Sequence, residues 1–306
     1  MGEDGNTSTF DTSYTNFFLM GFPVLQEWQP LLVLPLTFLY VTVISANTLA
    51  IHTVVAQRSL HQPMYLLIAL LLAINVCAAT AMVPKMLAGF VHYANPISLH
   101  SCLAQMFFIY FTLLLDYNLL LAMALDRYVA ICHPLRYTDL MTSHLLAVLA
   151  ILALTRSLGV FDSAGQCWKK TNNKLGLAMR LVTVTFDLAL LGASYTRIIY
   201  AAFRISSGGA RAKALHTCGS HLLVILTIYL SGLSTSTVFR VAKTMSQDVE
   251  NLLSAIYLLL PGALNPVIYG VRTREIRQHV EKMLYSPLLA NNCFLNSQNA
   301  FSISIQ

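Results

Sequence analysis

Charged residues are scarce in this chain of 306 residues: Asp, Glu, Lys and Arg make up only 10% of it, against about 25% in an average soluble domain. Apolar residues make up 56%, and the mean hydropathy is +0.63. So few charges cannot cover the surface of a soluble core of this size. The composition excludes an ordinary cytosolic enzyme, a disordered protein and a nucleic-acid-binding protein. Loops of a membrane protein explain the net charge of +6 better than a phosphate-binding face does.

The chain contains several long runs without charged residues. A membrane-spanning helix needs about 20 mostly apolar residues, and its backbone amides must pair within the segment because lipid offers no partner. Five runs lack Asp, Glu, Lys and Arg: Trp28–Gln57, Ser59–Pro84, Met86–Leu115, Ala214–Phe239 and Asn251–Val271. Two more are interrupted: Leu145–Phe161 by Arg156, and Leu175–Phe203 by Arg180, Asp187 and Arg197. The sequence predicts an all-α bundle of seven transmembrane helices.

The two ends of the chain differ in charge, which predicts its orientation. Residues 1–27 contain Glu and Asp but no Lys or Arg, whereas residues 272–284 contain Arg272, Arg274, Arg277 and Lys282. Cytoplasmic segments carry the excess of Lys and Arg. We therefore expect residues 1–27 outside the cell, residues 28–271 in the bundle and residues 272–306 in the cytoplasm of a multi-pass plasma-membrane protein.

Smaller features agree with this orientation. The sequon at Asn6 falls in the expected outer segment and is a candidate glycosylation site. The acidic, polar start shows no cleavable signal peptide, so we expect the first span to act as an anchor. Residues 272–284 have the spacing of a short amphipathic helix on the anionic inner leaflet, with a solvated helix end as the alternative. Residues 285–306 are expected to be disordered.

The six cysteines offer one candidate disulfide. Only Cys102 and Cys167 fall on the expected outer, oxidising side of the membrane. No CxxC motif or close Cys/His pair is present, so the sequence predicts no metal site.

Four motifs point to one family. They are MALDRYVAIC at Met123–Cys132 followed by HPLRY to Tyr137, PGALNPVIY at Pro261–Tyr269, LHQPMY at Leu60–Tyr65, and KALHTCGSH at Lys213–His221. Together they closely resemble the odorant (olfactory) receptors, a branch of the rhodopsin-like G-protein-coupled receptors, from about residue 15 to residue 285. The sequence around Pro84 and the HPLRY motif resemble those of the class I, fish-like subgroup.

The resemblance implies an activation switch at the inner end of span three. An Arg in hydrocarbon is costly unless it is paired. Arg127 is therefore either a snorkelling residue at the membrane edge or the partner of Asp126 in a resting state that opens a cytoplasmic cleft when it is released. The resemblance favours the switch, and it adds Tyr128, Lys213 and His221 to the residues of activation and G-protein coupling.

Span seven carries the second part of the expected switch. Pro266 removes a backbone hydrogen bond and kinks a helix. Tyr269 lies about one turn further on and would move with the kink. The alternative is a tolerated membrane proline, but the surrounding motif favours a functional role for Asn265, Pro266 and Tyr269.

Asp116 is an acid in the middle of span three, and its expected partner in span two departs from the family pattern. An intramembrane carboxylate is a functional hypothesis by default. In the family it pairs with a second acid in span two to bind sodium, but here that position is Asn75. We expect Asn47, Asn75, Asp116 and Asn265 to form a polar cluster. Sodium binding is doubtful with one charge fewer, and no other cofactor is expected.

The resemblance places the ligand in the outer half of the bundle, between spans three, five, six and seven. The expected contacts are apolar with a few polar anchors, as small-molecule sites usually are. They are Ile109, Tyr110, Leu113 and Leu114 in span three, and Tyr229, Leu233, Ser236 and Arg240 in span six. Tyr229, Ser236 and Arg240 share one helix face by their spacing. Arg240 either pairs with a carboxylate ligand or faces solvent in a loop.

One departure concerns the outer loop between spans four and five. The family's loop is long and carries several cysteines, whereas here only residues 162–173 separate the two spans, with Cys167 as the one cysteine. The stretch resembles a deletion that removes the lid of the pocket and leaves the Cys102–Cys167 pairing open.

The sequence predicts a chemosensory receptor and not an enzyme, because no catalytic set lies within the spans. It would bind a small volatile or short-chain organic molecule, activate a stimulatory, olfactory-type heterotrimeric G protein and raise cyclic AMP. The alternative is a non-signalling, misfolded or degenerate receptor remnant. A transporter is disfavoured because no inverted repeat is visible.

Overall fold

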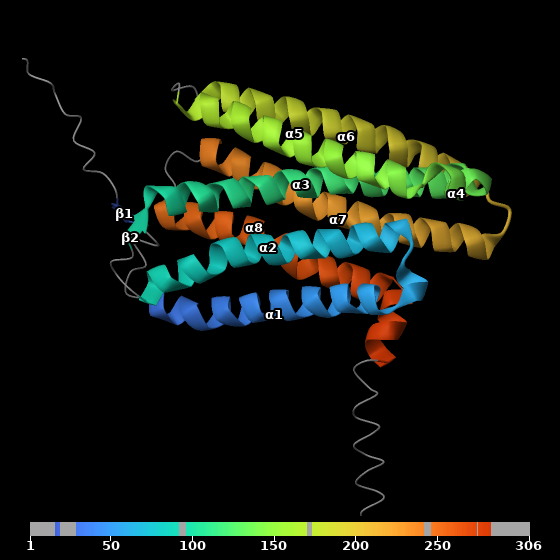
Figure 1. Ribbon diagram of the computed structural model, residues 1–306, viewed down its shortest axis with the longest axis horizontal. Coiled ribbons are helices and arrows are strands. Elements are labelled where there is room, and N and C mark those ends of the chain that lie inside the picture. Colours follow the sequence, from blue (N-terminus) through green and yellow to red (C-terminus); the bar gives the residue numbers. More distant parts are fainter. Residues whose placement is uncertain are drawn as a thin grey trace, which may run out of the picture.

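The computed structural model describes residues 16–18, 29–91, 96–169, 173–241, 246–273 and 275–282. Seven long helices dominate these residues: α1 (Gln29–Ala56), α2 (Pro63–Val91), α3 (Leu99–Cys132), α5 (Ser143–Lys169), α6 (Asn173–Phe203), α7 (Gly208–Val241) and α8 (Gln247–Arg272). Short helical turns lie between them: η2 (Arg58–Leu60), η3 (Pro134–Arg136) and α4 (Tyr137–Leu140). The predicted all-α, seven-helix bundle is confirmed (Figure 1).

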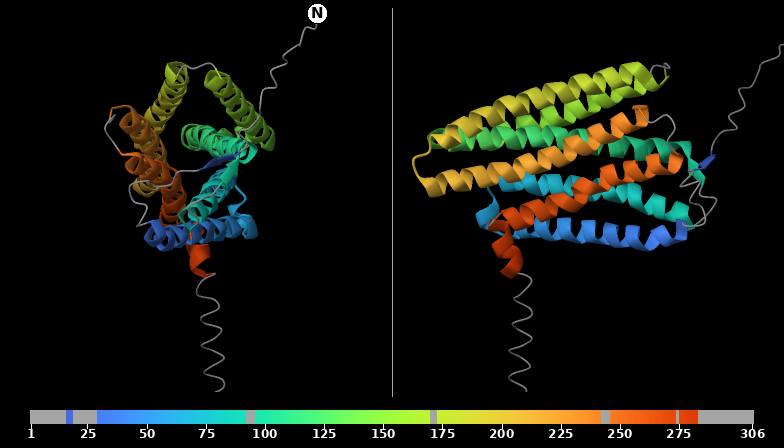
Figure 2. Two further views of the ribbon diagram at one scale, coloured as in Figure 1. Left: turned by 90° about the vertical axis from the view of Figure 1, so that its left-hand side faces the viewer. Right: turned by 180° about the vertical axis from the view of Figure 1, so that it is seen from behind.

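Helix α3 runs through the middle of the bundle and contacts α2, α5, α6 and α7. Helices α1, α2 and α8 pack together on one side of it, and α5 and α6 lie on the other side (Figures 1 and 2). A residue on α3 can therefore link the two sides of the bundle.

The helices have the length and composition of membrane spans. Five of them can cross a membrane by themselves, and up to seven if each of two bent helix pairs is one span. Their outer faces remain apolar: Leu34 and Phe38 on α1 expose 76% and 75% of their surface. In water such a belt would favour aggregation, but it is the ordinary surface of a helix that faces lipid.

Three helix boundaries differ from those predicted. Helix α2 continues past Lys85 to Val91, and α3 begins only at Leu99, so the break between uncharged runs at Lys85 does not separate the second span from the third. Asp116, Asp126 and Arg127 lie within α3, as the motifs predict. Helix α5 continues to Lys169, so most of the expected outer loop at residues 162–173 is helical. The rule of uncharged runs failed because long side chains near helix ends reach the interface and because the buried acids Asp126 and Asp187 pair with arginines inside the bundle.

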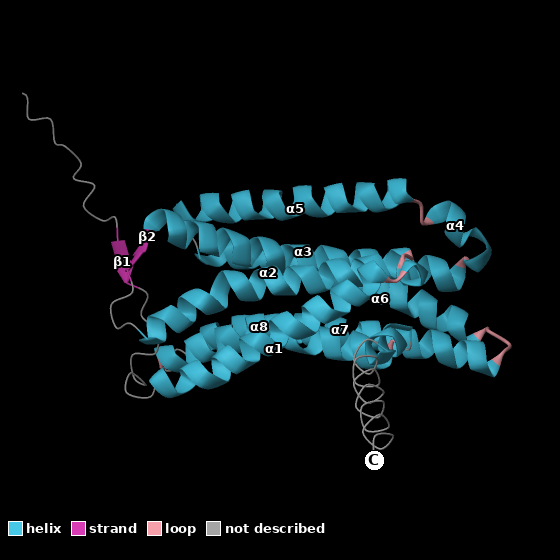
Figure 3. Cartoon of the chain, turned by 60° about the horizontal axis from the view of Figure 1, so that its bottom comes forward, coloured by secondary structure: helices cyan, strands magenta, loops and turns pink. Residues whose placement is uncertain are grey.

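A two-stranded antiparallel sheet closes the end of the bundle at which α3 begins. Strand β1 (Asn16–Phe18) pairs with β2 (Pro96–Ser98), with Phe17 opposite Ile97 (Figure 3). The pairing holds a segment near the N-terminus against the connection between α2 and α3. The remainder of the predicted outer segment lies outside the described residues, and so does residue 6, the predicted glycosylation site.

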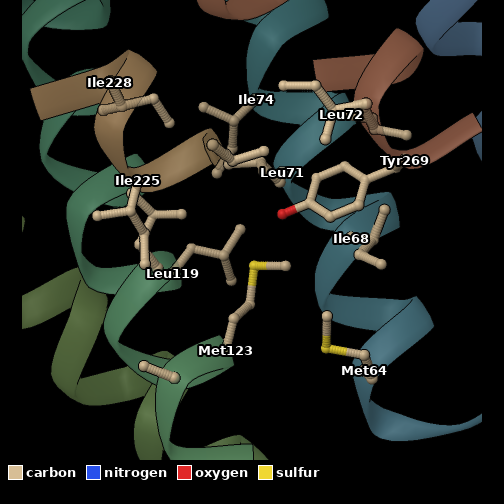
Figure 4. Close-up of a cluster of buried hydrophobic side chains, with 14 of the residues drawn as sticks. Met64, Ile68, Leu71, Leu72, Ile74, Leu119, Met123, Ile225, Ile228 and Tyr269 are labelled. Carbon is tan, nitrogen blue, oxygen red and sulfur yellow. The ribbon is translucent and has the colours of Figure 1, made fainter. Parts of the chain in front are cut away.

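The largest buried cluster joins α1, α2, α3, α6, α7 and α8. Figure 4 shows the ring of Tyr269 from α8 among Ile68 and Leu71 of α2 and Met123 of α3. Tyr269 is one of the largest fully buried side chains. The core thus fixes the predicted switch residue of span seven against α3.

A short helix at residues 275–282 follows α8 and turns away from it by 92° (Figure 1). Ile276 is fully buried and Val280 packs against the large core cluster, whereas Arg277 and Glu281 form an exposed pair. The predicted amphipathic helix is present, with its apolar side against the bundle. Its location on the inner leaflet stays a prediction, and residues 285–306 lie outside the described residues.

Candidate functional site

The predicted switch at the end of α3 is assembled in the structure. The Asp126 side chain is completely buried, and its Oδ2 atom lies 3.2 Å from Nη2 of Arg127. The Tyr137 hydroxyl, from α4, donates a hydrogen bond of 2.7 Å to Asp126 Oδ1. Asp126 is thus held by two partners, one on its own helix and one on the following turn. Sequence reasoning missed Tyr137 as a partner, although it lies in the quoted HPLRY motif.

Tyr137 keeps its proton in this arrangement. Burial is the main cause that raises the pKa of Tyr137 far above its usual range. The hydrogen bond to Asp126 and the negative charge of that carboxylate raise the pKa of Tyr137 further. The residue lies beyond the end of α3 and remains a hydrogen-bond donor at every physiological pH. It therefore holds Oδ1 of the Asp126 carboxylate while Arg127 lies beside Oδ2.

Several buried polar atoms close to the inner ends of the helices have no hydrogen-bond partner among the described residues. They are Oδ2 of Asp126, which has only the ion pair with Arg127, Nε of Arg127, the Tyr195 hydroxyl and Nε2 of His221. His221 Nδ1 and the Tyr269 hydroxyl lie 3.5 Å apart, at the limit of a hydrogen bond, and their rings are 5.6 Å apart. Buried unsatisfied polar groups are costly. This region therefore has groups that a different arrangement of α6, α7 and α8 could satisfy.

The other predicted coupling residues lie around this centre. The Tyr128 ring packs edge-on against His133, with 5.6 Å between ring centres. The ammonium group of Lys213, on α7, lies 3.3 Å from the carboxylate of Glu275 in an exposed ion pair. Pro266 is buried within α8. The structure brings Asp126, Arg127 and Tyr137 into contact, and His221 close to Tyr269.

The predicted polar cluster is only partly connected. Asn47 donates hydrogen bonds to the carbonyl oxygens of Val43 (2.7 Å) and Gly262 (2.8 Å), and Asn75 donates a long one of 3.4 Å to Asn47. The cluster thus ties α1 to α2 and α8. Asp116 Oδ1 and both side-chain polar atoms of Asn265 are buried without a partner among the described residues.

A second polar network, in the middle of the bundle, was missed. Arg156 of α5 donates to both carboxylate oxygens of Asp187 on α6, at 2.7 and 2.8 Å, and to Asn118 Oδ1 on α3, at 2.8 Å. Asn118 also donates to Ser157 at 3.2 Å. Asp187 and Ser157 are fully buried. In the sequence the two charges interrupt the predicted spans, and opposite charges near the centres of consecutive antiparallel spans are a signal for such a pair.

The predicted ligand residues on α3 have mixed exposure. Ile109, Leu113 and Leu114 are half-buried, and Tyr110 exposes 50% of its surface. Residues 233, 236 and 240 belong to α7, but the side chains of Leu233, Ser236 and Arg240 lie outside the described residues. Their role in ligand binding stays a prediction.

Tyr229 is the one predicted ligand residue of α7 whose side chain is described. It is buried, and its ring lies 4.8 Å from that of Tyr117 on α3. The Tyr117 hydroxyl is 3.3 Å from that of Tyr257 on α8. A Cβ atom at Gly232 would lie only 3.0 and 3.1 Å from these two hydroxyls. Three tyrosines and a close-approach glycine thus form an aromatic layer between the inner switch and the outer half of the bundle.

Cys102 is a free cysteine in the structure, and the predicted Cys102–Cys167 disulfide stays a prediction. Residue 167 belongs to the last turns of α5 and not to a loop that could fold back over the bundle. The side chain of Cys167 itself lies outside the described residues. Within the described part of the chain, no group of three or more His, Cys, Asp or Glu residues could hold a metal ion.

Comparison with known proteins agrees with the motifs. The family model described as "Olfactory receptor" matches residues 36–164 and 163–286. Olfactory receptor 52Z1P of Homo sapiens is 36% identical over 296 aligned positions, which cover 88% of this chain and 99% of that protein. Olfactory receptor 52P1 of Homo sapiens is 37% identical over an alignment that covers 93% of this chain and 97% of that protein. Olfactory receptor 51E2 of Rattus norvegicus is 34% identical over an alignment that covers 90% of this chain and 95% of that protein.

The match to the family model is divided at one place. The family model matches in two segments that meet at residues 163–164, within α5. The alignment with olfactory receptor 52Z1P is 296 positions long, but it includes only 88% of the 306 residues of this chain. The remaining positions of the alignment are therefore gaps in this chain. These relatives therefore carry sequence that this chain lacks.

Proposed function

The chain belongs to the olfactory receptor family, so it is a multi-pass, odorant-sensing G-protein-coupled receptor and not an enzyme, and on that premise we propose the finer points of its function. It is a class I receptor that binds a small volatile or short-chain organic molecule. Binding activates a stimulatory, olfactory-type G protein and raises cyclic AMP. The receptor acts in the plasma membrane, with its N-terminus outside the cell.

The contact set around Asp126 is the observation that supports signalling most directly. Its carboxylate faces both Arg127 and the Tyr137 hydroxyl, while Arg127 Nε, Tyr195 and His221 Nε2 have no partner among the described residues. Outward movement of α7 would let Arg127 leave Asp126 and donate hydrogen bonds to the Tyr195 hydroxyl and to Nε2 of His221 instead. A ligand that binds the moved state more tightly would shift the population toward it.

The aromatic layer supports a ligand in the outer half of the bundle. Tyr229 and Tyr257 belong to the helices that carry His221 and Tyr269, and they pack against Tyr117 of α3. A ligand above this layer would press on α7 and α8 near their middle. Arg240 is the proposed anchor for a carboxylate ligand.

We propose no cofactor, and a sodium ion is doubtful. Asp116 and Asn265 have buried atoms without partners among the described residues, which fits a small cation. The position of the second acid is Asn75, and its amide group points its donor at Asn47. A purified receptor should therefore melt at nearly the same temperature in NaCl and in KCl of equal ionic strength; stabilisation specific to NaCl would contradict this.

The test is a cyclic AMP assay in cells that express the chain with a surface tag, against a panel of short-chain acids and alcohols. We expect a response that Arg127→Ala abolishes and Arg204→Ala leaves intact, because Arg204 stacks on Tyr200 away from the switch. If acids alone respond, Arg240→Ala should remove the response. A receptor that reaches the surface but responds to nothing, with no difference between these variants, would contradict the proposal.

A damaged receptor is the second candidate, and the interrupted match favours it. The connection between α5 and α6 is limited to residues 170–172, so a long outer loop is absent. If this chain is a remnant, surface staining should be lost and should return when the loop of a full-length relative is grafted between α5 and α6. Normal staining of the unaltered chain would contradict it.

A further inference from the structure

A cavity of about 650 Å³ lies between α3, α5 and α6. Its lining is mostly apolar and includes Leu125 of α3, Leu149 and Leu152 of α5, and Leu190 of α6. Volumes of this order are typical of small-molecule and cofactor sites. The cavity is on the opposite side of α3 from α1, α2 and α8, and none of the predicted odorant contacts lines it.

The cavity opens toward the membrane and not toward the interior of the bundle. Leu152 and Leu190 both line it, yet they expose 58% and 45% of their surface. Side chains that are exposed on the side of a transmembrane bundle face acyl chains. A molecule could enter this cavity from the bilayer without passing the outer half of the receptor.

One end of the cavity lies near the proposed cytoplasmic edge of the membrane. Tyr128 and Arg197 line that end. The thiol of Cys132, the last residue of α3, lies 3.8 Å from the carbonyl oxygen of Arg197. Arg197 is therefore level with the inner end of α3, where a lipid headgroup begins.

The cationic groups at the two ends differ in their partners. Arg156, at the deeper end, is held by Asp187 and Asn118. Arg197 is exposed, and none of the four ion pairs in the described part of the chain includes it. Its guanidinium group is therefore available to an anion from outside the protein.

We propose that this cavity binds an anionic phospholipid of the cytoplasmic leaflet, with one acyl chain along the leucines and the phosphate against Arg197. The inner leaflet is rich in anionic lipids, and a guanidinium group matches phosphate geometry with paired hydrogen bonds. The assignment to the cytoplasmic leaflet rests on the orientation proposed above. Because Tyr128 adjoins Arg127, a lipid bound here would contact the helix segment that carries the switch.

The first test uses the unaltered chain. The purified receptor is placed in nanodiscs of phosphatidylcholine with a small fraction of phosphatidylserine that carries a photoreactive group on one acyl chain. Cross-linked peptides should come from the cavity walls, residues 121–128, 149–156 and 190–197, and excess unlabelled phosphatidylserine should suppress them. Labelling spread evenly over all lipid-facing helices, or equal competition by phosphatidylcholine, would overturn the proposal. An odorant as the true occupant would appear as competition by odorants alone.

Two matched pairs of variants sharpen the result. Arg197→Gln should reduce phosphatidylserine labelling about fivefold, the ratio that corresponds to about 1 kcal/mol for one basic residue near an anionic surface. Arg204→Gln, in the turn that follows the same helix and outside the cavity lining, should not. Ala193→Trp fills the cavity and should abolish wall labelling, whereas Ala189→Trp, exposed on the same helix and absent from the lining, should not. Equal effects within either pair would overturn the proposal.

The measurement does not depend on signalling. It needs no odorant and no G protein, and both leaflets of the nanodisc have the same composition, so neither a silent receptor nor a reversed orientation would alter it. Loss of wall labelling would overturn the lipid site while leaving the odorant receptor assignment untouched. Absence of a cyclic AMP response with retained labelling would overturn the proposed signalling and leave the lipid site standing.

Discussion

The two sides of α3 are held together by different chemistry. On the side of α1, α2 and α8, a stripe of buried side chains runs along α2 from Met64 to Phe90, and the polar ties are neutral amides. On the other side, α6 shares the large buried cluster with α3, but Ser157 is the only residue of α5 that is buried in the described part of that helix. There the tie is a full ion pair, Arg156–Asp187, beside a cavity.

The difference shows what a polar contact does in lipid. Helices in a bilayer gain little from the hydrophobic effect, so packing and interhelical hydrogen bonds decide their association. Where the helices pack closely, weak amide bonds are sufficient. Where they leave a cavity, the charge pair carries much more of the association, and its loss should be correspondingly severe.

The largest expected effect is the loss of the charge tie. Asp187→Ala leaves Arg156 without its bidentate partner inside the membrane, and removal of one member of a buried ion pair costs about 3 to 5 kcal/mol. We expect the purified receptor to lose thermal stability strongly and its surface level to fall. Asp139→Ala, an exposed acid of α4, is the control. If both variants melt alike, the pair does not hold α5 to α6.

A smaller effect is expected on the other side of α3. Asn47→Ala removes the hydrogen bond to Gly262 that links α1 to α8, and interhelical bonds of this kind contribute about 0.6 to 1.7 kcal/mol. Ser45→Ala is the control, because Ser45 bonds only to carbonyl groups of its own helix. The melting temperature should fall for Asn47→Ala alone, and by less than for Asp187→Ala. A larger loss than that of Asp187→Ala would reverse the comparison.

The inner switch joins the end of α3 to the start of α4 and should respond in activity more than in stability. Tyr137→Phe removes the donor to Asp126 Oδ1, a contribution of about 1 kcal/mol. Basal cyclic AMP should rise by up to about fivefold, since the resting state loses a contact. Tyr200→Phe keeps the ring that Arg204 covers and should leave basal signalling unchanged. Lower basal signalling in Tyr137→Phe would mean that Tyr137 supports the active state.

The smallest effect is expected at the exposed pair between α7 and the last helix. Lys213 and Glu275 lie 3.3 Å apart, but 78% of the lysine side chain is exposed. Such pairs contribute about 0.2 to 1 kcal/mol and are screened by salt. Glu275→Gln should change the melting temperature by less than Asp187→Ala or Asn47→Ala does, and the difference should vanish at high salt. A salt-independent loss would show that Glu275 acts through other contacts.

The sequence predicted the helices better than the contacts between them. Hydropathy and the four motifs were enough for the bundle, because membrane spans need long apolar runs. The partnership of Asp126 with Arg127 followed from adjacency. The Arg156–Asp187 pair and the Tyr137 contact did not, because they depend on the depth of residues in different segments. The continuation of α5 through residues 162–169 was missed because polar residues there resemble a loop.

The central claim is that Asp126, Arg127 and Tyr137 form a working switch in this receptor. The most direct test is nucleotide exchange by a purified stimulatory G protein reconstituted with the receptor, without ligand. The account predicts the order Tyr137→Phe, unaltered chain, Arg127→Ala, from fastest to slowest. Identical exchange for all three, at the rate of the G protein alone, would contradict it.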